Sequence, residues 1–190
     1  MRVLVLDFRK AARLLKQGGT ALKDIERKAS VKVKLSKEGV DSRAEISGEP
    51  AGEWLAEQAL FAVGLGFAPK DALKLLGDKH FLEVIDLEQL FGGNERSIGR
   101  YKARVIGTEG KVKAKLEELS GAVLALSDGS QIGVLGEFDD VRTAKEAVIR
   151  ILEGGQHGGV FVWLKGEKRR KDAEAMGLNI KRGRPVSPVA

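Results

Sequence analysis

The chain has 190 residues and no cysteine, which excludes disulfides, thiolate catalysis and cysteine-bound zinc. Hydrophobic residues make up 43% and charged residues 32%, a balance typical of one medium or two small globular domains rather than of a disordered chain. The formal net charge is +6 and there are only two histidines, so we expect a basic protein without a metal or any other cofactor.

The first half of the chain predicts elements in the order β-α-α-β-β-α. Residues 2–6 and 31–35 alternate between apolar and polar side chains, which indicates strands, and residues 44–47 form a short return strand. Residues 8–15 and 20–29 have apolar side chains at helical spacing on either side of a turn at residues 16–19. A longer helix follows and contains Trp54 and Phe61, which we expect to lie in the core.

The second half repeats this order. Residues 12–35 match residues 103–126 at a constant offset of 91, which indicates a duplicated domain. A connecting helix is predicted over 70–76, strands over 81–87, 123–126 and 131–135, and helices over 97–106, 111–119 and 139–152. A last helix over about 160–176 follows a glycine-rich joint at 154–159. The identical pairs of the repeat are Ala12/Ala103, Arg13/Arg104, Gly19/Gly110, Glu26/Glu117 and Leu35/Leu126.

A four-residue turn with glycine at both ends joins the paired helices of the second copy. It reads Gly107-Thr108-Glu109-Gly110 and is followed by Lys111. Glycine lets the backbone bend sharply and lets a ligand approach where a Cβ would otherwise stand. Free N–H groups and the helix dipole at the start of the next helix favour a phosphate. The turn therefore predicts a phosphate site, with a plain glycine turn as the structural alternative.

The element order and this turn resemble the KH domain of type I topology, whose GxxG loop clamps the backbone of four nucleotides. The resemblance covers residues 2–65 and 81–152. It implies an α+β fold of two KH domains, each a three-stranded sheet covered by helices, plus a C-terminal helix. The expected divisions are a first KH domain (1–66), a connecting helix (67–79), a second KH domain (80–153), a basic helix (154–176) and a flexible tail (177–190).

By this resemblance, single-stranded RNA lies in a groove between the paired helices and the second strand of each domain, whose backbone reaches the base edges. The contacts expected in the second domain are Arg100, Arg104, Ile106, Gly107, Thr108, Glu109, Gly110, Lys111, Lys113, Val123, Leu124 and Ala125. An ordinary core role is the alternative for the apolar members of this set. In the first domain Lys16 replaces the leading glycine, so binding there is expected to be weaker. These weaker contacts are Arg13, Lys16, Gln17, Gly18 and Gly19, together with Lys168, Arg169 and Arg170 of the basic helix.

Several motifs are similar to the second KH domain of the archaeal partner-of-Nob family of ribosome-assembly proteins. They are Arg104-Val-Ile-Gly-Thr-Glu-Gly-Lys111, Leu116-Glu-Glu-Leu-Ser-Gly121 and Gly154-Gly-Gln-His-Gly158. The resemblance implies a role in maturing small-subunit ribosomal RNA near its 3′ end. It also implies two protein partners, the endonuclease that trims this RNA and the alpha subunit of translation initiation factor two.

The C-terminal segment and its aromatic residues have plain structural readings as well. Residues 165–190 hold eight bases and three acids, which suits a phosphate backbone or a solubilising tail. We expect His157 to be a turn or packing residue, and Phe161 and Trp163 to pack on the second domain. The absence of a long apolar run and an early acid at Asp7 predict a cytoplasmic protein, and the composition resembles that of thermophiles.

Three other functions compete with RNA binding. An enzyme is disfavoured because the chain lacks a phosphate-binding loop of nucleotide hydrolases, a nucleophile elbow and a zinc-protease motif. A protein-interaction scaffold with little RNA affinity is favoured by Lys16 and Glu109, which depart from the usual turn. Single-stranded DNA is the third candidate, because a KH groove reads bases and backbone.

Overall fold

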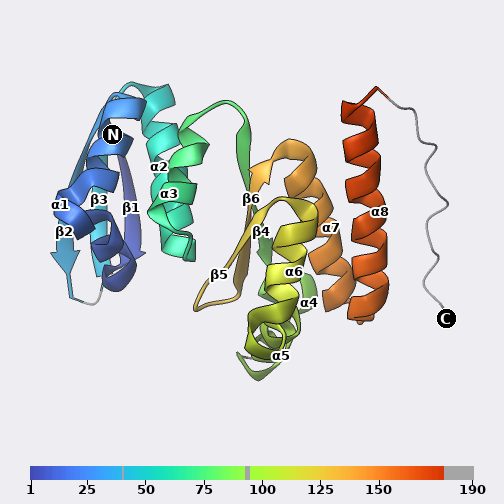
Figure 1. Cartoon of the computed structure of the whole chain (residues 1–190). Helices are drawn as coiled ribbons and strands as arrows, with labels where there is room; N and C mark the ends of the chain where they lie inside the picture. The colour runs from blue at the N-terminus through green and yellow to red at the C-terminus, as the bar shows by residue number, and fades with distance from the viewer. Residues whose placement is uncertain (40, 93–94, 178–190) are drawn as a thin grey trace.

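The computed structural model describes residues 1–39, 41–92 and 95–177, apart from the side chains of Phe8, Gln17, Gly18 and Glu38. Two modules follow each other along the chain, each built on a three-stranded antiparallel sheet, and a long helix closes the C-terminal side (Figure 1). The α+β class and the two sheets agree with the expectation from the sequence. The tail expected over 177–190 lies outside the described residues except for Gly177.

The first module contains β1 (Arg2–Asp7), α1 (Phe8–Ala29), β2 (Val31–Glu38), β3 (Asp41–Gly48) and α2 (Pro50–Leu65). Its sheet has the order β1-β3-β2, so β2 is an edge strand. The alternation in β2 buries Val31 and Val33 against the helices and leaves Lys32 and Lys34 in solvent. The edge strand of this sheet therefore has exposed lysines on one face and buried valines on the other.

Helix α1 differs from the two helices expected in this region. It is one element of 22 residues that runs through positions 16–19, and only Gly19 has a left-handed backbone, with φ +75°. A side chain at Lys16 disfavours positive φ, so the chain stays helical where the second module turns. Asp7 caps the start of α1 by accepting hydrogen bonds from the N–H groups of Arg9 and Lys10.

The second module contains β4 (His80–Asp86), α4 (Leu87–Phe91), α5 (Glu95–Ile106), a 3₁₀ turn η2 (Thr108–Gly110), α6 (Lys111–Ser120), β5 (Val123–Leu126), β6 (Gln131–Glu137) and α7 (Phe138–Leu152). Its sheet order, β4-β6-β5, leaves β5 at the edge. Here the expected pair of helices on either side of the glycine turn is confirmed. The sequence did not predict α4, a single short turn capped by Asp86.

Helix α8 (His157–Ala175) begins inside the glycine-rich joint, three residues earlier than expected. Val160 and Leu164 are buried in the core that α8 shares with α6 and α7. Phe161 and Trp163 pack against the same core, as predicted, and the Arg150 guanidinium lies 4.1 Å from the centre of the Trp163 ring. The C-terminal helix is therefore part of the second module.

A shared apolar core joins the two modules. The connection consists of α3 (Pro69–Ala72) and the 3₁₀ helix η1 (Leu73–Leu76), preceded by the buried Phe67. Ala125 and Leu135 of the second sheet belong to the core of the first module. A Cβ at Gly133 would lie 2.6 Å from the Phe67 ring, so only glycine lets this ring reach the sheet. The second sheet is thus covered by α2 and the connection on one face (Figure 1).

The expectation of a buried Trp54 is wrong, because this residue is 51% exposed on α2. The apolar face of α2 is made instead by Ala56, Ala59, Leu60 and Val63, all fully buried. Phe61 packs at the margin of the core, as expected. Helical spacing alone places Trp54 and Phe61 on one face, but the residues that α2 buries against the core are Ala56, Ala59, Leu60 and Val63.

Candidate nucleic-acid interface

The turn between α5 and α6 has a backbone that requires its glycines. Gly107, Glu109 and Gly110 all have positive φ, at +70°, +55° and +73°. The Gly107 N–H donates to the Ala103 carbonyl at 2.8 Å, and the Gly110 N–H donates to the Gly107 carbonyl at 3.2 Å. A Cβ on Gly107 would lie 2.3 Å from Cγ2 of Val112, whereas a Cβ on Gly110 would meet nothing within 4 Å. The turn is closed on the Gly107 side and open on the Gly110 side.

The open side leads directly to the N-terminus of α6. This helix begins at Lys111, and no side chain among the described residues caps its first N–H groups. Such groups, together with the helix dipole, attract an anion. The arrangement therefore has the features that a phosphate site requires, with bare backbone at Gly110.

We expect Gly107→Ala to lower the free energy of unfolding by about 1–3 kcal/mol, because its Cβ would overlap with Val112 and positive φ disfavours alanine. Gly110→Ala is the comparison variant, since its φ of +73° and ψ of 10° lie in the left-handed region, which strains alanine less than the φ +70° and ψ 175° of Gly107, and its Cβ overlaps with nothing. Urea unfolding of both variants measures the difference. Equal losses would show that neither the packing behind Gly107 nor its backbone conformation is the reason for glycine there.

The basic side chains near the turn are partly engaged within the protein. Lys111 pairs with Glu109 at 2.7 Å, and both are largely exposed. Lys113 pairs with Glu117 at 2.9 Å. Arg100 is exposed and donates to Ser97, so it remains available on the surface of α5. The acid at Glu109 thus offsets one of the lysines expected to contact phosphate.

Arg104 and His157 link the turn to the start of α8. The Arg104 guanidinium donates to the Gly155 carbonyl at 3.3 Å, and Nε2 of His157 lies 3.0 Å from the Arg104 carbonyl. Together with Ala103, Gly107, Thr108 and Val112, these residues line a pocket of about 540 Å³ behind the turn. The sequence alone did not show this contact, because it placed His157 in a loop before the helix.

The apolar residues expected in the groove wall divide into two groups. Ile106 is exposed and Val123 is half-buried. Leu124 and Ala125 are buried in the cores on opposite faces of the second sheet. Neither side chain therefore lines the edge of β5, and of these two residues only Leu124 directs its backbone groups away from β6, because the direction of these groups alternates along the strand.

A glutamate missed by sequence reasoning occupies that edge. Oε1 of Glu117, on α6, accepts a hydrogen bond of 2.7 Å from the Leu124 N–H. In the first module, Oε1 of Glu26 accepts from the Val33 N–H at 2.9 Å. Both residue pairs differ by the repeat offset of 91, so the identity of Glu26 and Glu117 within the repeat was the signal in the sequence.

The loop between β5 and β6 is held by lysines from both modules. The Lys102 ammonium, from α5, donates to the carbonyls of Ser127 at 2.5 Å and Gly129 at 3.0 Å. Asp128 pairs with Lys10 of the first module at 3.0 Å, and this hydrogen bond lowers the pKa of the Asp128 carboxyl. Lys102 and Lys10 therefore hold the loop in place from both modules.

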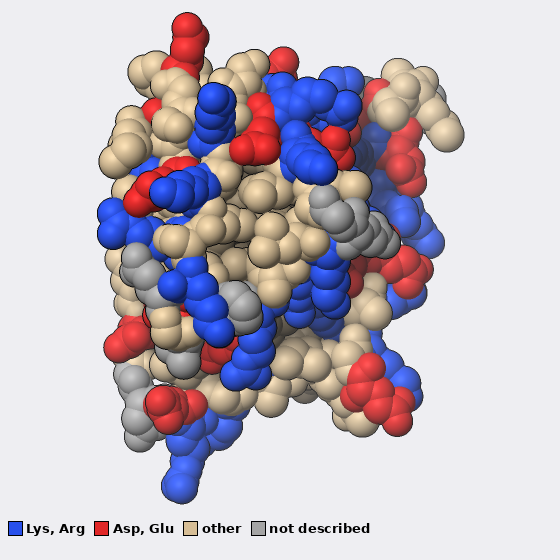
Figure 2. All heavy atoms as spheres, turned by 90° about the vertical axis from the view of Figure 1, so that its left-hand side faces the viewer, with Lys and Arg blue, Asp and Glu red and all other residues tan. Residues whose placement is uncertain are grey.

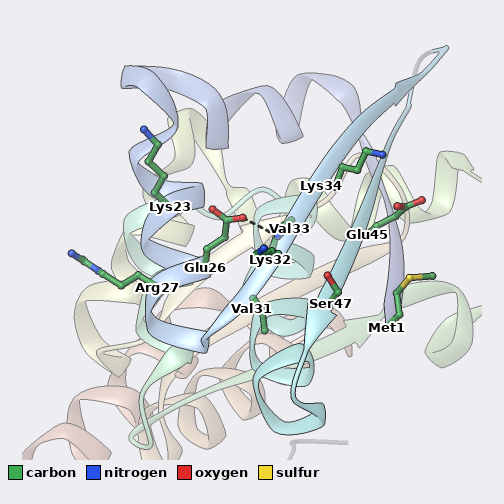
Figure 3. Close-up of a pocket in the computed structure, with 10 residues that line it drawn as sticks. All are labelled: Met1, Lys23, Glu26, Arg27, Val31, Lys32, Val33, Lys34, Glu45 and Ser47. Carbon is green, nitrogen blue, oxygen red and sulfur yellow. Dashed lines mark hydrogen bonds between the residues drawn. The ribbon is translucent and has the colours of Figure 1, made fainter.

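In the first module, α1 and β2 occupy the place that α6 and β5 have in the second. An open pocket of about 730 Å³ lies between α1 and β2 (Figure 3). Its basic lining residues are Lys23 and Arg27 from α1 and Lys32 and Lys34 from β2. Glu26 lies between this helix and strand. On this side of the molecule, Lys and Arg side chains surround an area of uncharged residues, with Asp and Glu interspersed (Figure 2). Sequence reasoning missed this basic lining.

The weaker RNA contacts that the sequence predicts in the first module lie away from this basic pocket. Lys16 is exposed on α1, and Arg13 donates to the Gly66 carbonyl at 3.4 Å. Gly19 is buried, and Gln17 and Gly18 belong to the backbone of the same helix. Arg13, Lys16 and Gly19, the described members of this set, do not line the pocket of Figure 3. The turn of the first module is thus not a copy of the second.

The basic residues of α8 are mostly held by neighbours. Lys168 donates to the Glu118 carbonyl at 3.2 Å, and Arg170 pairs with Glu167. The hydrogen bond from Lys171 to Asp140 raises the pKa of Lys171. Arg169 is exposed and, within the described part of the chain, forms no hydrogen bond or ion pair.

Among residues 1–39, 41–92 and 95–177, no group of three or more His, Asp or Glu side chains is placed to hold a metal ion. None of the helices in this part of the chain is both long enough and apolar enough to cross a bilayer.

Known proteins resemble the chain in sequence and in fold. Residues 81–169 match the eukaryotic-type KH domain (KH-domain type I). A KH domain-containing protein of Methanocaldococcus jannaschii is 35% identical over 159 residues, which cover 83% of the chain and 69% of the relative. The pre-rRNA-processing protein PNO1 of Coccidioides immitis is 31% identical over 133 residues, which cover 70% of the chain and 49% of the relative. The chain thus spans about half the length of this fungal protein.

A solved structure extends this likeness to most of the fold. It is the Dim2p chain of Pyrococcus horikoshii, crystallised as an a/eIF2alpha–aDim2p–rRNA complex. The match has a TM-score of 0.73 at 26% identity and covers 88% of the chain and 94% of that protein.

Proposed function

Because the chain belongs to the family of KH-domain proteins that includes the Methanocaldococcus jannaschii protein and PNO1, we propose that it binds single-stranded ribosomal RNA of the small subunit. It acts near the 3′ end of this RNA, in pre-rRNA processing and ribosome assembly in the cytoplasm. It works by binding alone, without catalysis and without a cofactor.

The open backbone at Gly110 supports this proposal more than any other feature. A Cβ there would meet nothing within 4 Å, and the uncapped first turn of α6 follows immediately. A nucleic-acid phosphate fits such a site because it accepts hydrogen bonds from backbone N–H groups and needs close approach. The bases then lie toward the edge of β5, where Leu124 offers its backbone carbonyl.

The second module is the main reader and the first module is an auxiliary site. The first module lacks the glycine turn, but its pocket carries Lys23, Arg27, Lys32 and Lys34. These side chains attract a phosphate backbone without reading sequence. RNA that leaves the second groove therefore gains electrostatic contacts on the first module.

Two protein partners accompany this role. The solved Pyrococcus horikoshii neighbour is bound to a/eIF2alpha as well as to rRNA. We extend that pairing to this chain and add the endonuclease that trims the small-subunit RNA.

The first test is fluorescence anisotropy with a labelled RNA that copies the 3′ end of small-subunit ribosomal RNA, compared with scrambled RNA and with DNA of the same sequence. Preference for the native RNA supports the proposal. Weak binding that is indifferent to sequence would refute it and would leave the scaffold function, which the Glu109–Lys111 ion pair at the turn favours.

We expect the double variant Lys32→Ala and Lys34→Ala to weaken binding of this RNA by about threefold to tenfold, because two phosphate contacts are lost. The slope of log Kd against log salt should fall by roughly 1.4, about 0.7 for each contact. Lys70→Ala with Lys79→Ala is the control, since both lysines are exposed and line neither pocket. An equal effect of both double variants would exclude a specific role for the pocket of the first module.

A further inference from the structure

The two modules share a polar contact between a helix and the edge strand of the sheet. Glu117 of α6 and Glu26 of α1 each accept a hydrogen bond from an edge-strand N–H, at 2.7 Å from Leu124 and 2.9 Å from Val33. In both cases only Oε1 is used, and among the described residues Oε2 receives no hydrogen bond. Figure 3 shows Glu26 in this position between helix and strand.

This contact changes what the edge strand offers to a base. An unpaired edge strand presents both N–H donors and C=O acceptors. Once the glutamate takes the N–H of Leu124, the centre of the groove presents the Leu124 carbonyl and the second carboxylate oxygen, which are both acceptors. A base placed there must therefore provide a hydrogen-bond donor.

Resting on the RNA binding proposed above, we propose that Glu117 and Glu26 are specificity-determining residues that select a base with an exocyclic amino group, cytosine in preference to uracil, at the centre of each groove. Glutamate accepts readily from the N4 amino group of cytosine, whereas uracil carries a carbonyl oxygen at the same place. Cytosine and uracil have the same size, so this preference is electronic and not steric.

Lys113 strengthens the argument for the second module. Its ammonium lies 2.9 Å from Oε1 of Glu117, so a donor stands beside the acceptor. The Watson–Crick edge of cytosine has the complementary order, with the N4 amino group next to the N3 acceptor. For Glu26 no lysine is paired among the described residues, so we expect the first module to discriminate less.

The variant Glu117→Gln distinguishes base selection by this side chain from a role in which the glutamate only stabilises the strand. The glutamine carbonyl still accepts from the Leu124 N–H, while the amide NH₂ replaces the free carboxylate oxygen by a donor. The hydrogen bond to the strand is thus kept, while the group that faces the base changes from a hydrogen-bond acceptor to a donor. A purely structural role predicts no change in base preference.

Glu118→Gln is the matched control. It removes one negative charge at the neighbouring position, where the side chain is 61% exposed and pairs with Lys115. Glu118 contacts neither Leu124 nor the glycine turn among the described residues. Both variants therefore change the net charge equally, and only Glu117→Gln changes the groove.

The experiment measures Kd of labelled eight-nucleotide oligo(rC) and oligo(rU) by anisotropy for the wild type, Glu117→Gln, Glu26→Gln, the double variant and Glu118→Gln, with thermal melting to confirm folding. We expect the wild type to prefer oligo(rC) by about tenfold, the value for one good base contact. Glu117→Gln should reduce this preference to about twofold, the double variant should abolish it, and Glu118→Gln should leave it unchanged.

The outcomes separate this inference from the function on which it rests. If the wild type binds neither oligonucleotide nor the ribosomal RNA, RNA binding itself is refuted. If it binds ribosomal RNA but shows no preference for cytosine, or if folded Glu117→Gln keeps the preference, the role of the glutamates is overturned while RNA binding stands.

Discussion

Gly110→Asp is expected to lower the affinity for single-stranded RNA by about 10- to 100-fold, a loss of about 1.4–2.7 kcal/mol, while the second module stays folded. The new carboxylate would stand in the open space beside the first turn of α6, at the proposed phosphate site, and would repel a phosphate there. Folding survives because no atom lies within 4 Å of the new Cβ, and aspartate tolerates the φ of +73° better than most residues.

Gly92→Asp is the control for this prediction. Gly92 also has a positive φ, +60°, with nothing within 4 Å of its Cβ, and it lies at the other end of α5. It has the same charge change, and with ψ −163° it is the more strained site for aspartate, so retained binding by this variant would show that backbone strain alone does not weaken RNA binding. Anisotropy with the ribosomal RNA should separate the two variants. Unchanged binding by folded Gly110→Asp protein would disprove the phosphate site.

Leu164→Ala should lower the free energy of unfolding by about 2–4 kcal/mol, because this α8 side chain is fully buried in the core of the second module and its removal leaves a cavity. Val162→Ala is the matched variant on the same helix. Val162 is 71% exposed, so its loss should be less than about 0.5 kcal/mol.

Urea unfolding followed by circular dichroism measures both variants. A small loss for Leu164→Ala, equal to that of Val162→Ala, would mean that α8 is only an appendage of the second module. The expected large loss would make α8 one of its structural helices, in agreement with the KH-domain match that extends to residue 169.

The glycine turn was predictable because local chemistry alone determines it. Gly107 and Gly110 have the positive φ that their positions on either side of a sharp turn demand. The alternation in β2 likewise predicted a strand with one face exposed to solvent and one face buried, and the structure confirms it. These features depend on residues that are neighbours in the sequence.

The single helix α1 and the exposed Trp54 were not predictable in the same way. At Lys16 the choice between a turn and a helix depends on one missing glycine, and two glycines nearby suggested a break. Trp54 has helical spacing with Phe61, but the closeness of α2 to both sheets decides which residues are buried. Tertiary packing thus overrode the local pattern.

The contacts of Glu117 and His157 depend on distant partners. Glu117 reaches Leu124 across a helix–strand turn, and His157 reaches Arg104 from a helix that begins 53 residues later. For Glu117 the repeat carried a usable signal, since an identical charged residue in a diverged duplication suggests a shared contact. For His157 the sequence carried no comparable signal.

The apolar contact of Phe67, Ala125 and Leu135 between the modules has a consequence for how a long RNA is held. Because this contact is buried, the two grooves keep a constant separation, and no entropy is lost in bringing the modules together. An RNA that occupies one groove meets the other at a high effective concentration, but only if its intervening nucleotides match the distance. Under the proposed binding to both grooves, we therefore expect affinity to depend on the length of the strand between two segments as well as on their bases.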